Sequence, residues 1–275
     1  MNRPPVSAKF PGVHADIPPL TGVPVLVTRP GKAGESLCDA IAARNGRPIL
    51  LPTIAIEAVD PGSTLGAPAR ADLAIFVSRA AVDFGVVIMQ RSMPEMPQTI
   101  IAVGEATATA LARHGIAAVT PPAGASNSEG LLQLPQLQAE HIRQRRILVF
   151  RGQGGREHLA EGLRQRGAEV QYVEVYRRRP LVADIAAAVA AAGGQRPQVM
   201  VATSVEVLAA LADSIHAQRQ DWLSALPLVT LSERIAEEAA RLGFTGPVWL
   251  ARDPCEEAIL DALTEWAECR HGTAR

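Results

Sequence analysis

The fold of this chain is decided by a strand motif that occurs twice, first as Val25-Leu-Val-Thr-Arg-Pro30 and again as Ile147-Leu-Val-Phe-Arg-Gly152. In both copies a run of apolar residues, typical of a strand buried in a parallel sheet, ends at an arginine. Leucine or isoleucine residues spaced four apart follow each copy, which is typical of a helix face. Each copy therefore predicts a β-strand followed by an α-helix.

Two further kinds of segment recur in the same order. A buried strand ending in a hydroxyl residue occurs at residues 72–78 and 198–204, and a short strand before an alanine-rich helix begins at Ile100 and Pro227. The equivalent positions of the three pairs are 122, 126 and 127 residues apart. This near-constant spacing indicates duplication of a βα-rich lobe, and alternating strands and helices predict parallel sheets.

Composition narrows the class of protein. The 275 residues, 48% of them hydrophobic, can build two domains, and the net charge of −1 argues against a nucleic-acid-binding protein. The three cysteines and six histidines show no metal-ligand spacing, so no metal site is predicted. No apolar run is long enough to cross a membrane, and residues 1–22, rich in proline, are interpreted as a flexible lead-in and not as a signal peptide.

Two extended stretches, residues 49–59 and 170–180, lie between the repeated segments. Their alternating apolar residues suit exposed or half-buried strands. Each stretch is either a linker between the lobes or the second strand of its own sheet, and periodicity leaves both alternatives open.

Ligands of open parallel sheets bind beyond the carboxyl ends of the strands, where helix N-termini also favour anions. A cleft between two such lobes would be rich in groups that bind carboxylates. The residues predicted at these positions are Thr28, Arg29, Ser78, Arg79, Gly104, Glu105, Arg151, Gly152, Thr203, Ser204 and Ser232. Helix capping explains part of this set without a ligand, because Thr203 with Glu206 and Ser126 with Glu129 fit capping boxes.

Other motifs give weaker signals. Residues 151–156 form a glycine-rich loop that fits neither GxxxxGK[ST] nor GxGxxG, although Glu174 keeps a nucleotide site open as an alternative. No G-x-S-x-G elbow is present. Tyr176 precedes three arginines, residues 177–179, which alternate sides on a strand, so that at least one can face a cleft while the others form an exposed edge.

The ordered set of motifs resembles the uroporphyrinogen-III synthase family. The matching stretches are VLVTRP (25–30), DLAIFVSRAAV (72–82), AVGEAT (102–107), SEGLL (128–132), ILVFRGQGGR (147–156), VEVYR (173–177), TS (203–204) and SERI (232–235). No single stretch is specific, but their order and spacing over residues 24–268 are. The chain departs from many relatives after Ser78, where Arg79 is followed by two alanines, and around Ser232.

The resemblance implies an α/β fold of two flavodoxin-like lobes with parallel sheets, joined by a two-stranded β linker. Lobe 1 would be discontinuous, formed by residues 23–52 and 181–268, and lobe 2 would be residues 60–172. The linker strands would be residues 53–59 and 173–180. Residues 1–22 would be a flexible extension and residues 269–275 a tail.

The implied reaction converts hydroxymethylbilane, a linear tetrapyrrole with eight carboxylates, into uroporphyrinogen III without metal or cofactor. Loss of the ring-A hydroxyl as water gives an azafulvenium cation, and a spiro intermediate then allows ring D to invert. The family's candidate for the general acid corresponds to Tyr176. Carboxylates would be bound around Ser78, Gly104, Ser128, Gly130, Arg151, Thr203 and Ser232, largely through backbone N–H groups.

The three cysteines fit no disulfide framework, which predicts a cytoplasmic location, and charge and hydropathy predict neither nucleic-acid nor membrane partners. We also expect a monomer that receives its substrate by transient handover from hydroxymethylbilane synthase. Two rival readings remain open on the residues alone. One is a two-lobe protein that binds a small anion without turnover, and the other is a nucleotide- or flavin-binding regulator.

Overall fold

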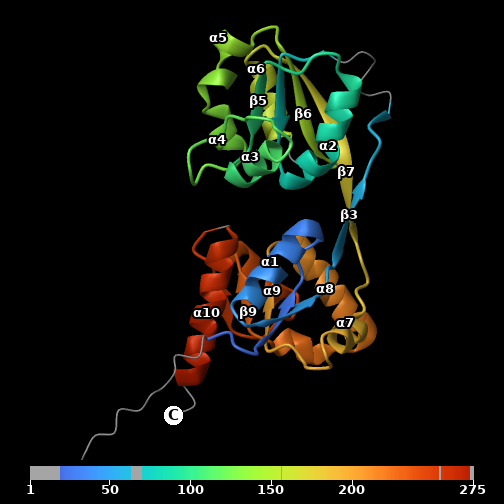
Figure 1. Cartoon of the computed structure of the whole chain (residues 1–275), viewed down its shortest axis with the longest axis vertical. Helices are drawn as coiled ribbons and strands as arrows, with labels where there is room; N and C mark the ends of the chain where they lie inside the picture. Colours follow the sequence, from blue (N-terminus) through green and yellow to red (C-terminus); the bar gives the residue numbers. More distant parts are fainter. Residues whose placement is uncertain (1–18, 63–69, 156, 254, 273–275) are drawn as a thin grey trace, which may run out of the picture. The chain divides into compact units, whose positions relative to one another are not determined.

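The computed structural model describes residues 19–62, 70–155, 157–253 and 255–272. Backbone contacts divide the chain into two compact units: unit 1 comprises Met1–Ala55 and Pro180–Arg275, and unit 2 comprises Ile56–Arg179 (Figure 1). The expectations for residues 1–18, for Arg156 and for residues 273–275 lie outside the described residues.

Unit 1 contains a five-stranded sheet with the order β10-β9-β8-β1-β2, in which neighbouring strands are parallel. The strands are β1 (Pro24–Val27), β2 (Arg47–Leu50), β8 (Val199–Val201), β9 (Leu228–Thr230) and β10 (Val248–Leu250). Every residue of β1, β8 and β9 is buried, because these central strands are covered on both faces. The apolar runs in the sequence predict these three strands for the same reason.

Helices cover both faces of the unit 1 sheet (Figure 1). Val25 and Val27 pack with helices α1 (Gly31–Ala43) and α10 (Glu256–Gly272). Leu26 points to the other face, into a cluster with α7 (Ile185–Ala191), α8 (Val205–Gln218) and α9 (Glu233–Arg241). The described structure extends beyond the predicted lobe boundaries: Leu20, placed in the lead-in, is buried in the first cluster, and α10 continues to Gly272.

Unit 2 contains the sheet β3-β7-β6-β4-β5, in which β5, β4, β6 and β7 are parallel. The strands are β3 (Ile54–Ala58), β4 (Leu73–Phe76), β5 (Thr99–Ala102), β6 (Arg146–Gly152) and β7 (Glu169–Pro180). The side chains of β4 alternate between two clusters. One cluster joins Phe76 to α2 (Arg79–Ser92) and α3 (Glu105–Ala112); the other joins Ile75 to α4 (Ser128–Leu132), α5 (Ala139–Ile142) and α6 (His158–Gln165).

The two extended stretches form strands of the two sheets. The first part of residues 49–59 belongs to β2, the partner of β1, and the rest forms β3. Strand β7 pairs with β6 on one side and β3 on the other. Backbone hydrogen bonds from Leu181 N to Thr53 O (2.8 Å) and from Val59 N to Val175 O (3.0 Å) show that β3 and β7 run antiparallel.

Both sheets have a point where the strand order reverses, which is where ligands of open α/β sheets bind. In unit 1 it lies between β1 and β8, whose neighbours in the chain, β2 and β9, lie on opposite sides. In unit 2 it lies between β4 and β6. The carboxyl ends of β4 and β6 are therefore a candidate position for a ligand-binding site.

Candidate functional site

A cavity of about 320 Å³ lies at the carboxyl ends of β4 and β6 in unit 2. Its lining is formed by Val77, Ser78, Ser128, Val149, Arg151, Gly152, Gln153, Gly154, Gly155, Leu159, Tyr172, Tyr176 and Arg178. The lining thus combines hydroxyl groups, a glycine-rich backbone segment and two arginines with the apolar side chains of Val77, Val149 and Leu159. None of these described lining residues is acidic, so the cavity suits an anionic ligand.

An irregularity in strand β7 places Tyr176 in this cavity. Arg151 of β6 is opposite Glu174, but Gly152 is opposite Tyr176, so that Val175 has no partner residue on β6. Such a bulge re-aims the next side chain, and the consecutive residues Val175 and Tyr176 are accordingly both buried. The Tyr176 ring packs beside Phe84 of α2, with ring centroids 6.3 Å apart.

Gly152 makes room for the Tyr176 ring. A Cβ atom at position 152 would lie 2.5 Å from Cε2 and 2.6 Å from Cζ of that ring, far closer than van der Waals contact allows. Any other residue at position 152 would therefore displace the phenol. This requirement, and not a left-handed backbone angle, explains the glycine that ends β6.

The hydroxyl of Tyr176 meets the start of helix α2. Ser78 is the N-cap of α2, and its Oγ accepts a hydrogen bond from Ala81 N (3.0 Å). The same Oγ lies 3.1 Å from the Tyr176 hydroxyl, and either group can be the donor. The phenol thus sits at the positive end of a 14-residue helix, where negative charge is stabilised.

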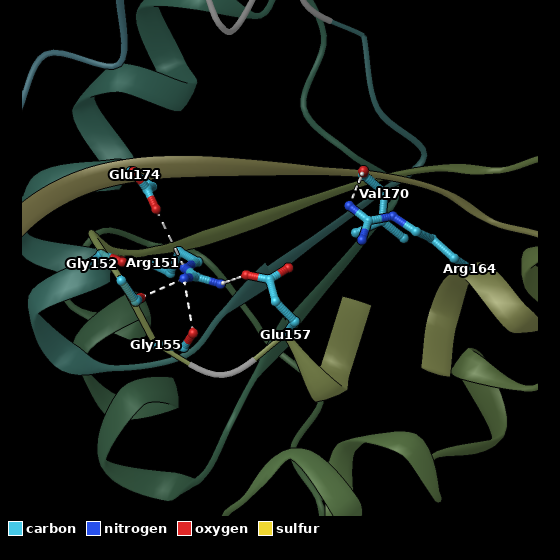
Figure 2. Close-up of polar contacts among 8 residues, drawn as sticks. Arg151, Gly152, Gly155, Glu157, Arg164, Val170 and Glu174 are labelled. Atoms are coloured by element: carbon cyan, nitrogen blue, oxygen red, sulfur yellow. Dashed lines mark hydrogen bonds and ion pairs between the residues drawn. The ribbon is translucent and has the colours of Figure 1, made fainter. Parts of the chain in front are cut away.

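Arg151 organises the loop that closes one side of the cavity (Figure 2). Its buried guanidinium contacts the Glu157 carboxylate (3.2 Å) and the Gly152 carbonyl (3.2 Å), and it also donates to the Gly154 carbonyl. Glu174 lies 3.8 Å from Nε on the other side. Arg151 therefore holds Gly152, Gly154 and Glu157 in place, using donors that the sequence-based prediction assigned to a ligand.

Tyr172 forms the wall beside Arg151, whose guanidinium stacks over its ring at 4.0 Å. Burial, and next the negative charge of Glu157, raise the pKa of Tyr172 above its ordinary value. Its hydroxyl oxygen is buried without a hydrogen-bond partner among the residues that the structure describes.

The cavity brings together five residues predicted from the sequence, namely Ser78, Ser128, Arg151, Gly152 and Tyr176. Four other predicted residues of unit 2, Arg79, Gly104, Glu105 and Gly130, are not among its lining. The backbone N–H of Gly130 donates to Asn127 Oδ1 (2.7 Å), so this group is already used in helix capping.

The remaining predicted residues lie at the carboxyl ends of β1, β8 and β9 in unit 1. Thr28 is fully buried and donates from Oγ1 to Val201 O (2.7 Å), which ties β1 to β8. Arg29 follows it, while Thr203 and Ser204 follow β8, and Ser232 precedes α9. Because these strands are parallel neighbours, their predicted residues share one edge of the sheet.

Both predicted capping boxes are wrong by one residue. Helix α8 is capped by Ser204, whose Oγ accepts from Val207 N (3.2 Å), and not by Thr203. Helix α4 is capped by Asn127 and not by Ser126. Each true cap lies one position later in the chain, where the backbone is still extended.

The predicted site residues did not include Tyr172 or the loop residues 153–155, and the run of three arginines was expected to turn at least one side chain to a cleft without Arg178 being singled out. Tyr172 is four residues before Tyr176 on the same strand, but the bulge between them places their side chains in different clusters, so strand alternation does not predict that both line the cavity. The loop is held by Arg151, a contact that no sequence pattern reveals.

Chemically, the cavity offers a buried phenol with a hydroxyl partner and a surface suited to anions. Among the described residues no three histidine, cysteine, aspartate or glutamate side chains lie close enough to hold a metal ion. The helices that the structure describes include none with the length and hydropathy of a membrane span.

Comparison with known proteins gives a consistent result. A family model described as "Uroporphyrinogen-III synthase HemD" matches residues 35–261. The chain is 33% identical over 250 residues to a uroporphyrinogen-III synthase of Escherichia coli, and the alignment covers 87% of this chain and 99% of that protein. It is 34% identical over 248 residues to the Salmonella typhimurium protein of the same name, with the same coverage.

Solved structures are similar in fold. A mutant uroporphyrinogen III synthase from Thermus thermophilus has a TM-score of 0.52 at 15% identity and covers 90% of this chain and 100% of its own. A uroporphyrinogen-III synthetase from Helicobacter pylori has a TM-score of 0.54 at 13% identity, and the match covers 89% of this chain and 99% of the Helicobacter protein. At these identities the likeness supports the α/β fold with mainly parallel sheets.

Proposed function

The chain belongs to the uroporphyrinogen-III synthase family, and on this premise we propose how its residues close the tetrapyrrole ring. The enzyme is a cyclising hydro-lyase of porphyrin and heme biosynthesis. It converts hydroxymethylbilane into uroporphyrinogen III, with loss of water and inversion of ring D through a spiro intermediate. The observation that carries the proposed site is the buried Tyr176 phenol, paired with Ser78 in the unit 2 cavity.

Tyr176 is the general acid of the proposed mechanism. Its hydroxyl proton passes to the ring-A hydroxyl, and the carbon–oxygen bond breaks. Water departs, and an azafulvenium cation remains. Such proton transfer typically contributes 10²–10⁴-fold to a rate. The phenolate that remains lies beside Ser78 Oγ and the N-terminus of α2, which stabilise negative charge.

The remaining activation barrier depends on how the reacting atoms of the bilane are positioned. The substituted carbon of ring D must meet the cation, form the spiro intermediate, and reclose after fragmentation. The proton released when the final ring becomes neutral restores Tyr176. Holding the reacting atoms in position accounts for this step without further chemical groups.

The carboxylates of the bilane bind hydroxyl and backbone donors in this proposal. In unit 2 we assign this role to Ser78, Ser128 and the backbone of Gly152, while Arg151 contributes by holding the loop. The cavity of about 320 Å³ is at the small end of ligand pockets, so it receives part of the bilane. The other predicted contacts remain proposals: Thr28, Arg29, Arg79, Gly104, Glu105, Gly130, Thr203, Ser204 and Ser232.

At the level of fold, we propose that the two units are flavodoxin-like lobes and that β3 and β7 are the linker. The strand order of unit 1, numbered within the unit, is 2-1-3-4-5, and the parallel strands of unit 2 follow 2-1-3-4. The unit boundaries lie within β3 and at the end of β7. A cytoplasmic location, a monomeric state and handover from hydroxymethylbilane synthase remain predictions.

Analysis of product isomers tests the activity. Hydroxymethylbilane is generated in situ with and without the protein, and the porphyrins are separated after oxidation. We expect isomer III with the protein and isomer I, the spontaneous product, without it. Isomer I alone in both reactions would contradict the synthase activity and favour a protein that only binds an anion.

A further inference from the structure

The three consecutive arginines of β7 are divided between two sides of the strand. Arg177 Nε donates to Glu57 Oε2 (2.9 Å), and Arg179 Nε donates to Glu57 Oε1 (2.7 Å). Both guanidinium groups therefore bind one carboxylate of the neighbouring strand β3. Strand alternation directs the intervening Arg178 to the opposite side.

Arg178 lines the unit 2 cavity together with Tyr176 and Ser78. Its guanidinium carbon is 6.0 Å from the centroid of the Tyr176 ring, within the range of a cation–π contact. The other lining arginine, Arg151, is buried and directs its donors to loop carbonyls and Glu157. Arg178 therefore places a second cation at the cavity wall, beside the phenol.

We propose that Arg178 binds a carboxylate of the pyrrole that carries the leaving hydroxyl and so aligns that hydroxyl with Tyr176. This inference rests on the proposed function and adds the residue that positions ring A. A guanidinium can donate two parallel hydrogen bonds to a carboxylate, which fixes orientation as well as distance. The substituents of one pyrrole ring are only a few bond lengths apart, so neighbouring arginine and tyrosine side chains can contact them together.

Kinetics of matched variants test this role. Arg178→Gln removes the cavity cation, whereas Arg177→Gln removes a neighbouring cation that binds Glu57. We expect Arg178→Gln to raise the KM for hydroxymethylbilane by roughly ten- to a hundredfold, the loss typical of a charge-assisted hydrogen bond. Arg177→Gln should stay within about twofold of the parent. Both variants should keep the thermal unfolding midpoint of the parent, because both side chains are exposed.

Two further measurements separate a carboxylate contact from a structural effect. Arg178→Lys should recover part of the KM because it restores the charge but not the two parallel donors. The KM of the parent should also rise more steeply with salt than that of Arg178→Gln.

Failure of the inference and failure of the function give different results. Equal KM values for Arg178→Gln and Arg177→Gln, with isomer III still formed by the parent chain, would overturn the role of Arg178 alone. Isomer I alone from the parent chain would overturn the synthase activity and the role of Arg178 with it.

Discussion

Tyr176 owes its position to two small neighbours. Gly152 leaves space for its ring, and Ser78 lies 3.1 Å from its hydroxyl while also capping α2. The bulge at Val175 turns the phenol from the side of Tyr172 toward the cluster that contains α2. The site therefore depends on local backbone geometry as much as on the identity of the tyrosine.

Replacing each cavity tyrosine by phenylalanine tests the acid assignment. We expect Tyr176→Phe to lower the rate of isomer III formation by about 10²-fold or more, because the proton donor is lost while the ring is kept. Tyr172→Phe is the matched control, since it keeps the ring that stacks on Arg151 and should stay within a few-fold of the parent. The rates are measured with hydroxymethylbilane generated in situ. Full activity in Tyr176→Phe would remove Tyr176 as the acid.

At single residues, the sequence predicted which residues line the cavity better than it predicted their contacts. The family motif pointed to Tyr176, and the end of β6 pointed to Arg151 and Gly152, all of which line the cavity. The guanidinium of Arg151, however, holds its own loop, and Arg178 lines the cavity because of strand alternation next to a bulge. Such details depend on backbone shifts of one residue, which apolar periodicity does not record.

At the scale of secondary-structure elements, Asp72 links the start of β4 to the start of β6. Its carboxylate accepts from the backbone N–H of Arg146 (2.9 Å) and from Arg145 Nη1 (2.8 Å). The hydrogen bond from Arg146, followed by that from Arg145, holds the pKa of Asp72 below its ordinary value. Because the folded-state pKa is lowered, the stabilisation is fully present above the ordinary pKa of about 4. It is lost as the pH falls through the lowered value.

Urea unfolding as a function of pH tests this link. We expect Asp72→Ala to lower the free energy of unfolding by about 1 kcal/mol at pH 7. The difference from the parent should shrink as the pH falls from about 4 through the lowered pKa of Asp72 in the folded parent. Asp213→Ala removes an exposed carboxyl on α8 and should stay within about 0.5 kcal/mol of the parent at both pH values. A difference for Asp72→Ala that does not change with pH would contradict this account.

Central strands were the elements best predicted from the sequence, because residues buried on both faces leave an uninterrupted apolar run, as in β4 and β6. The caps of α4 and α8 were predicted one residue too early. Several hydroxyl or amide residues stand together at each of these helix starts, and only the backbone angles decide which one becomes the cap.

For the whole molecule, the repeated segments pointed to two lobes but not to how the chain is divided between them. Periodicity alone would place each copy of the pattern in its own half of the chain. Instead, β1 and β2 lie in one sheet with β8, β9 and β10. In the sequence, the residues of unit 2 stand between these two groups of strands. A strand pattern specifies burial but not its partner, so this arrangement was expected only through the family resemblance.

Excision of unit 2 tests this division of the chain. Residues 180–275 alone lack β1, the strand between β2 and β8, and should not unfold cooperatively. Residues 19–55 joined to residues 180–275 by a short glycine-serine linker should recover a single urea transition. The linker has to span only a short distance, because Leu181 N and Thr53 O are hydrogen-bonded at 2.8 Å.

Residues 56–179 alone should also unfold cooperatively, since they contain β4 to β7 and both helical layers. Circular dichroism during urea unfolding measures all three, and a cooperative transition of residues 180–275 alone would show that the division is wrong.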